Sequence, residues 1–85
     1  MTTKIKKYQL LKDNTRKTQD GKTLFQIQAL VNSPLFKRGE LGGYIEKEMN
    51  LSQKGKAWVF RNAQVYGSAR VYGDAQVYGD AQVYK

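Results

Sequence analysis

The last third of the chain repeats every six residues, and this period constrains the fold more than any other feature. The repeats read VFRNAQ, VYGSAR, VYGDAQ, VYGDAQ and VYK, starting at Val59. A helix of 3.6 residues per turn cannot keep positions six apart on one face, so the pattern is not helical. Val- and Tyr-rich pieces separated by Gly-Ser, Gly-Asp or Arg-Asn pairs instead predict short strands joined by turns.

The period also predicts how these strands stack. Three strand-and-bend units close a triangular coil of about eighteen residues, and successive coils pair as parallel strands about 4.8 Å apart. The predicted fold class is therefore all-β, a short parallel β-helix of about two coils. The aromatic residue after each Val should point outward, because side chains alternate along a strand. The expected inward positions are Val59, Val65, Val71, Val77 and Val83, with Ala63, Ala69, Ala75 and Ala81 beside them.

The first half of the chain lacks the period and has a different prediction. Apolar residues among lysines over 4–11, and the run over 23–31, indicate two strands joined by a polar loop. Pro34 ends the second strand, and residues 35–43 read as an irregular connection. We expect residues 1–50 to form a β-hairpin cap and residues 51–85 the repeat region, together one compact domain.

The repeat resembles the hexapeptide repeat of left-handed parallel β-helices, whose best-known members are acyltransferases. A longer match spans roughly residues 8–84. Its Gly-Gly-Tyr-Ile-Glu segment at 42–46 and Asn-Leu-Ser segment at 50–52 precede Ala-Trp-Val at 57–59, as in small hexapeptide-repeat proteins of bacteriophages and prophages. The resemblance implies a left-handed coil. It also implies a phage-type protein that blocks host machinery, such as a CRISPR effector or another defence complex.

The composition argues against catalysis. The chain has no His and no Cys. The acyltransferases of the superfamily use a His base, and neither a Ser-His nor a Cys-His nucleophile pair can form. A His/Cys metal site is equally impossible. We therefore expect no enzyme, no catalytic or metal-binding residues and no cofactor.

The net charge of +8 is uneven along the chain. Residues 1–22 hold seven Lys and Arg residues against two Asp residues, which suggests an anionic or acidic partner. The predicted basic contacts are Lys4, Lys6, Lys7, Arg16, Lys17, Lys37 and Arg38. The predicted aromatic contacts, all expected to face outward, are Trp58, Phe60, Tyr66, Tyr72 and Tyr78. A protein partner, which could be a nucleoprotein complex, is the first hypothesis, and the alternative is nucleic acid or a nucleotide bound by this basic face with Tyr stacking. The alternative without a partner is that the basic residues only keep the protein in solution.

The chain stops within a repeat, at Val83-Tyr84-Lys85. An uncovered coil would leave unpaired strand edges, so we expect a homo-oligomer, a dimer or trimer, with Val83 and Tyr84 in its interface. A polymer-forming structural protein is the remaining alternative. No apolar run approaches a membrane-spanning length, and the N-terminus lacks a signal-peptide core, so a cytoplasmic location is expected, with no membrane partner.

Overall fold

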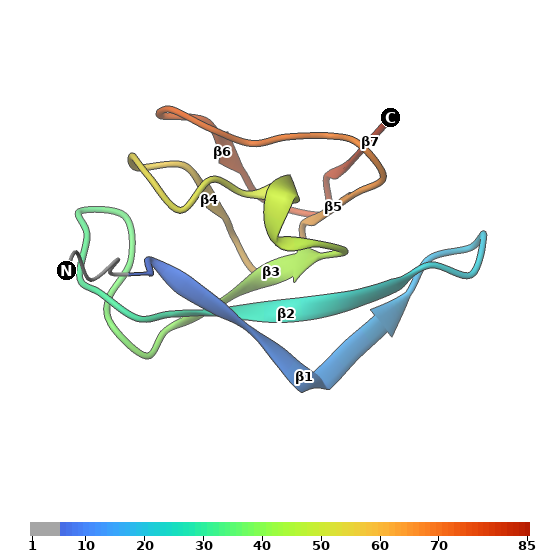
Figure 1. The fold of residues 1–85 in the computed structure, drawn as a ribbon, viewed down its shortest axis with the longest axis horizontal. Coiled ribbons are helices and arrows are strands. Elements are labelled where there is room, and N and C mark those ends of the chain that lie inside the picture. The colour runs from blue at the N-terminus through green and yellow to red at the C-terminus, as the bar shows by residue number, and fades with distance from the viewer. Residues whose placement is uncertain (1–5) are drawn as a thin grey trace, which may run out of the picture.

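A computed structural model describes residues 6–85, and Lys4 lies outside this range. Figure 1 shows the strands of the first half running below the shorter strands of the second half. The element order is β1 (Tyr8–Lys17), β2 (Thr23–Ala29), β3 (Leu41–Ile45), a 3-10 helix η1 (Glu48–Asn50), β4 (Trp58–Val59), β5 (Gln64–Tyr66), β6 (Gln76–Val77) and β7 (Gln82–Tyr84).

The predicted parallel β-helix is wrong. Strands β1, β2, β3, β5 and β7 form one open five-stranded sheet in that order, and β4 and β6 form a separate two-stranded sheet. Strand β3 pairs antiparallel with β2 on one side and parallel with β5 on the other, so the sheet is mixed. Within residues 6–85 the structure shows no closed or solenoid sheet. The chain is all-β, as predicted.

The first two strands form a longer hairpin than the sequence predicts. Strand β1 continues to Lys17, so only residues 18–22 connect it to β2. The extension passes a bulge between Leu11 and Thr15, where β1 bends sharply (Figure 1). The strand can contain many polar residues because its outer side faces solvent. There Lys12 Nζ lies 4.7 Å from the Phe25 ring centroid.

The last residues of the segment expected to be an irregular connection, 35–43, belong to strand β3. Gly42 and Gly43 are both buried because other chain segments lie against them. A Cβ on Gly42 would lie 2.6 Å from Ile27 Cγ1, and one on Gly43 would collide with the carbonyl oxygen of Phe60. The Gly-Gly pair therefore lets β3 pack closely between β2 and the repeat region.

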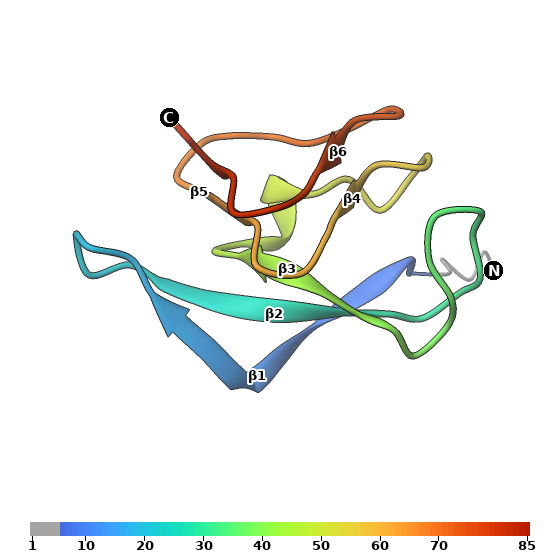
Figure 2. The same ribbon diagram turned by 180° about the vertical axis from the view of Figure 1, so that it is seen from behind.

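The repeat region pairs residues eighteen apart, as the period predicts. Trp58 pairs with Gln76 in β4–β6, and Val65 pairs with Val83 in β5–β7. The spacing is larger at Leu51 and Val71, which form a parallel bridge. Two extra residues in the loop around Gln53 and Lys54 account for this difference. We call residues 51–66 the lower layer and residues 71–85 the upper layer (Figure 2).

The core lies between the hairpin and the lower layer. Trp58 is fully buried, with Phe36 stacked on it at 4.0 Å and Tyr8 edge-on at 6.3 Å between ring centroids. Val59, Val65 and Val71 are buried as predicted. Val77 and Val83 are only half-buried, and Ala75 and Ala81 are exposed, so the prediction of burial is wrong for the upper layer beyond Val71.

Candidate interaction surface

The predicted basic residues do not form one patch. Lys6 makes an ion pair with Glu48, with 3.3 Å between Nζ and Oε1. The Arg16 guanidinium lies 4.2 Å from the centroid of the Tyr44 ring. Lys17 is exposed at the hairpin tip, at one end of β2. The loop after β2 carries Lys37 and Arg38, which are exposed beyond the other end of that strand. A strand of seven residues separates the two ends by about 23 Å, so these cations cannot share one small anion.

Lys7 has a structural role that the sequence analysis missed. Its side chain is buried, and Nζ donates to the carbonyl oxygens of Ala57 (2.7 Å) and Gly55 (3.4 Å). Burial lowers the pKa of this ammonium to about 8. Lys7 was predicted as a surface contact for a partner, but its side chain instead anchors the start of β1 to the chain just before β4.

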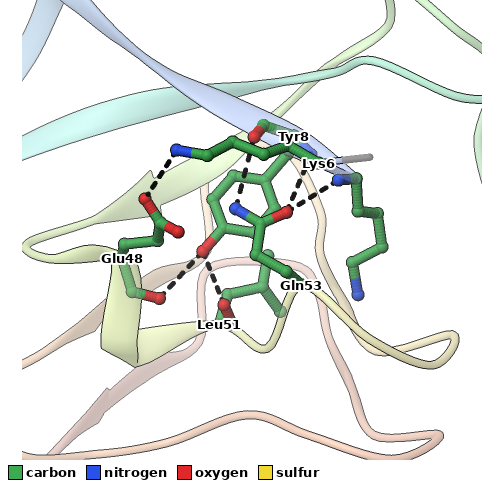
Figure 3. Close-up of polar contacts among 6 residues, drawn as sticks. Lys6, Tyr8, Glu48, Leu51 and Gln53 are labelled. Atoms are coloured by element: carbon green, nitrogen blue, oxygen red, sulfur yellow. Dashed lines mark hydrogen bonds and ion pairs between the residues drawn. The ribbon is translucent and has the colours of Figure 1, made fainter. Parts of the chain in front are cut away.

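Gln53 completes this anchor (Figure 3). Its Oε1 accepts hydrogen bonds from the backbone N–H groups of Lys7 (2.7 Å) and Tyr8 (3.3 Å), and its Nε2 donates to the Tyr8 carbonyl oxygen. The side-chain amide thus pairs with β1 as a strand backbone would. The Tyr8 hydroxyl shares its proton between the carbonyl oxygens of Leu51 and Glu48. Burial first, and then the charge of Glu48, raises the pKa of Tyr8. The available sequence signal was Gln53 itself, which stands where the six-residue phase calls for Val.

The predicted aromatic contacts divide into buried and exposed residues. Trp58 is 0 % exposed, so the prediction that it points outward is wrong: Phe36 and Tyr8 of the first half cover it. Phe60 is half-buried and packs against the core. In contrast, Tyr72 and Tyr78 are about 70 % exposed.

Tyr66 and Tyr84 stack as residues eighteen apart should. Their ring centroids lie 5.0 Å apart with 11° between the planes. The lower ring, Tyr66, is 8 % exposed, and the upper ring, Tyr84, is 62 % exposed. Desolvation, with smaller contributions from Tyr84 and Asp20, raises the pKa of the Tyr66 hydroxyl. The pair therefore forms an aromatic platform with one open face.

Equivalent positions of the two layers differ in burial because only the lower layer is covered. Val59 and Val65 are fully buried, whereas their partners Val77 and Val83 are half-buried. Strands β6 and β7 are the last strands of their sheets in the described chain. The upper layer therefore presents unpaired strand edges beside apolar side chains.

The corner glycines show the same contrast. A Cβ on Gly55 would lie 2.9 Å from the carbonyl oxygen of Gly73, and one on Gly67 would lie 2.7 Å from that of Lys85. Gly73 and Gly79 also have positive φ, yet a Cβ there would meet nothing within 4 Å. The corners of the upper layer therefore have the same kind of backbone geometry that lets the corners below them pack against a layer above.

The described residues contain no group of three or more Asp and Glu that could hold a metal ion. No helix in residues 6–85 is long and apolar enough to cross a membrane.

Comparison with models of known protein families finds no match, and a search of curated proteins finds no similar sequence. The resemblance to phage hexapeptide-repeat proteins therefore stays a prediction.

Proposed function

We propose that this protein is a non-enzymatic interaction protein that self-associates through the upper layer. The observation that carries the proposal is the burial contrast between equivalent residues, Val59 and Val65 being 0 % exposed while Val77 and Val83 are half-buried. A second copy placed on the upper layer pairs the free edges of β6 and β7. It also buries Val77 and Val83, and at about 25 cal/mol per Å² each 100 Å² of apolar area covered contributes about 2.5 kcal/mol.

The assembled form is proposed to be a closed dimer or trimer rather than a polymer. Antiparallel pairing of the same edge from two copies uses the upper layer of both and closes a two-fold dimer, so that this edge cannot add a further copy. The opposite ends of these molecules carry the β1–β2 hairpin, which offers a different surface. An open-ended series of sizes would instead support the polymer-forming alternative.

The target of the assembly is proposed from the resemblance alone. Small phage proteins of this kind block host machinery, so the proposed partner is a host protein or defence complex, such as a CRISPR effector, in the bacterial cytoplasm. Exposed Tyr72, Tyr78 and Arg38 offer contacts of the kind that dominate protein interfaces, and Lys37 adds positive charge beside Arg38.

Sedimentation of the 85-residue chain tests the self-association. We expect the parent to sediment as a dimer or trimer at high micromolar concentration. Val83→Lys should sediment as a monomer, because a second copy would then have to bury an unpaired ammonium. The matched control is Val31→Lys, a half-buried Val in the loop after β2. It should leave the oligomer unchanged. A monomeric parent, or an oligomer that survives Val83→Lys in a folded protein, would contradict the proposal.

A further inference from the structure

The hairpin tip and the side of the repeat region form a polar cleft, which shares strand β7 with the surface proposed for self-association. It has a volume of about 320 Å³. One wall is the tip, residues 17–20, and the other is the outward side of β5 and β7, with Gln64, Tyr66, Gln82 and Tyr84. This volume lies at the lower end of the range of small-molecule sites, about 300–1,000 Å³.

Two glutamine side chains in this cleft have unused hydrogen-bonding capacity. Gln64 and Gln82 are directly paired on β5 and β7, so their amides stand one strand spacing apart on the same side. No hydrogen bond joins either amide to another described residue. The glutamines of β2 differ, since Gln26 Nε2 donates to the Gly42 carbonyl oxygen (3.0 Å) and Gln28 Nε2 to that of Gly39 (3.1 Å). A primary amide offers two donors and an acceptor, and Gln is well suited to pair with the edge of a nucleobase.

Next to these amides lies an aromatic platform. Tyr84 stacks on Tyr66 and is itself 62 % exposed, so its ring is open to a ligand. A planar ring placed there extends the stack, and base–tyrosine stacking contributes about 1–3 kcal/mol. The cleft therefore combines stacking with hydrogen bonding to the edge of a ring.

The hairpin tip supplies charges of both signs on a fixed loop. Thr18 N–H donates to the Lys22 carbonyl oxygen (2.9 Å), and Gly21 N–H donates to that of Thr18 (3.1 Å). The Thr18 hydroxyl donates to the Asp20 carboxylate. This bond is the main cause that holds the pKa of Asp20 below its usual value. An ionised carboxylate accepts hydrogen bonds from ribose hydroxyls, and the Lys17 ammonium attracts a phosphate.

We propose that this cleft binds a ribonucleotide, with its base against Tyr84 and the Gln64 and Gln82 amides, its ribose near Asp20 and its phosphate near Lys17. The basic charge of the whole chain attracts such an anion to the surface. The site differs from the nucleotide-binding alternative that the sequence suggested. Of the basic residues expected to bind, only Lys17 lines this cleft.

Binding is tested with the ¹⁵N-labelled 85-residue chain, titrated separately with each of the four ribonucleoside 5′-monophosphates. We expect at least one nucleotide to shift the side-chain amide signals of Gln64 and Gln82 at millimolar concentration. Gln82→Ala should weaken binding about fivefold by removing a hydrogen bond. The matched control is Gln76→Ala, which truncates the same repeat position on β6, outside the cleft. Lys17→Ala should also weaken binding, whereas Lys37→Ala should not.

Several outcomes would overturn the site. No shift with any of the four nucleotides overturns it, as does an equal loss in the Gln82 and Gln76 variants. Inorganic phosphate binding as tightly as the nucleotide would reduce the cleft to an anion site. Single-stranded RNA that binds without moving the Gln64 and Gln82 signals would place the nucleic-acid contact elsewhere. Sedimentation of the parent and of Gln82→Ala measures self-association separately, so a failure of nucleotide binding is distinguishable from a failure of self-association.

Discussion

Lys7 donates from its buried Nζ to the carbonyl oxygen of Ala57 at 2.7 Å, across fifty residues of sequence. This bond joins the start of β1 to the segment that leads into β4, where the core aromatic Trp58 follows directly. An ammonium held in this place makes the stability of the protein depend on pH.

The first prediction concerns that pH dependence. The pKa of Lys7 is about 8 in the folded state and near 10.5 when unfolded, so the unfolded chain binds more protons between these values. Stability should therefore rise as the pH increases from about 8 to about 10.5. Tyr8 acts oppositely above about pH 10, because its pKa is raised by folding and the folded state there holds the extra proton.

Urea denaturation from about pH 7 to about pH 9.5 measures this slope, below the range where Tyr8 acts. Lys7→Met should flatten the curve. Lys6→Met should not, because Lys6 is exposed and pairs with Glu48 at the surface. An unchanged slope in Lys7→Met would show that another group titrates.

Asn50 links the 3-10 helix to the repeat region. It is fully buried: Oδ1 accepts from Lys47 N–H at 2.7 Å and Nδ2 donates to the Ala69 carbonyl oxygen at 2.8 Å. Asn50→Leu leaves both backbone groups unpaired, so we expect a loss of about 3 kcal/mol in the free energy of unfolding. Thermal or urea unfolding measures this loss. Asn32→Leu, at an exposed loop position, should cost less, and equal costs would contradict the assigned role.

Substitutions at the corner glycines distinguish the cost of backbone strain from the cost of a packing clash. Gly67→Ala and Gly79→Ala both place Cβ at positive φ, which costs about 1–2 kcal/mol. Only at Gly67 does the new Cβ also meet the Lys85 carbonyl oxygen, at 2.7 Å. Under conditions where the chain is monomeric, Gly67→Ala should lower the unfolding midpoint more than Gly79→Ala. Equal effects would mean that the two layers are not packed at this corner.

Trp58 reports on the core because it is the chain's single tryptophan. Its burial predicts blue-shifted fluorescence that moves to the red on unfolding. Trp58→Ala should cost about 3–5 kcal/mol, enough to unfold much of a domain this small. Trp58→Phe should cost less, because it keeps the stack on Phe36 and removes Nε1, which is buried without a hydrogen-bond partner in the described structure. Fluorescence of the parent typical of a solvated indole would contradict this placement.

The six-residue period correctly determined the local pairing of the repeat region. Val59 lies beside Val77, Val65 beside Val83, and Tyr66 stacks with Tyr84, since equal strand-and-turn units return the chain to the same side after eighteen residues. The all-β class and the inward direction of the first three Val residues follow from the same alternation. These properties depend on neighbours in sequence, so the sequence alone reveals them.

The tertiary structure decided what covers each face. Alternation predicted Trp58 to face outward, but Phe36 and Tyr8, distant in sequence, bury it. From the sequence, Lys7 is expected to be a surface cation, but in the structure its ammonium donates to the carbonyl oxygens of Gly55 and Ala57. The predicted β-helix was wrong because β3 also pairs with β2, which extends the stack into an open mixed sheet. Burial depends on contacts between segments that are distant in sequence and meet only in the folded chain. A local sequence period does not specify which distant segment will cover a given side chain.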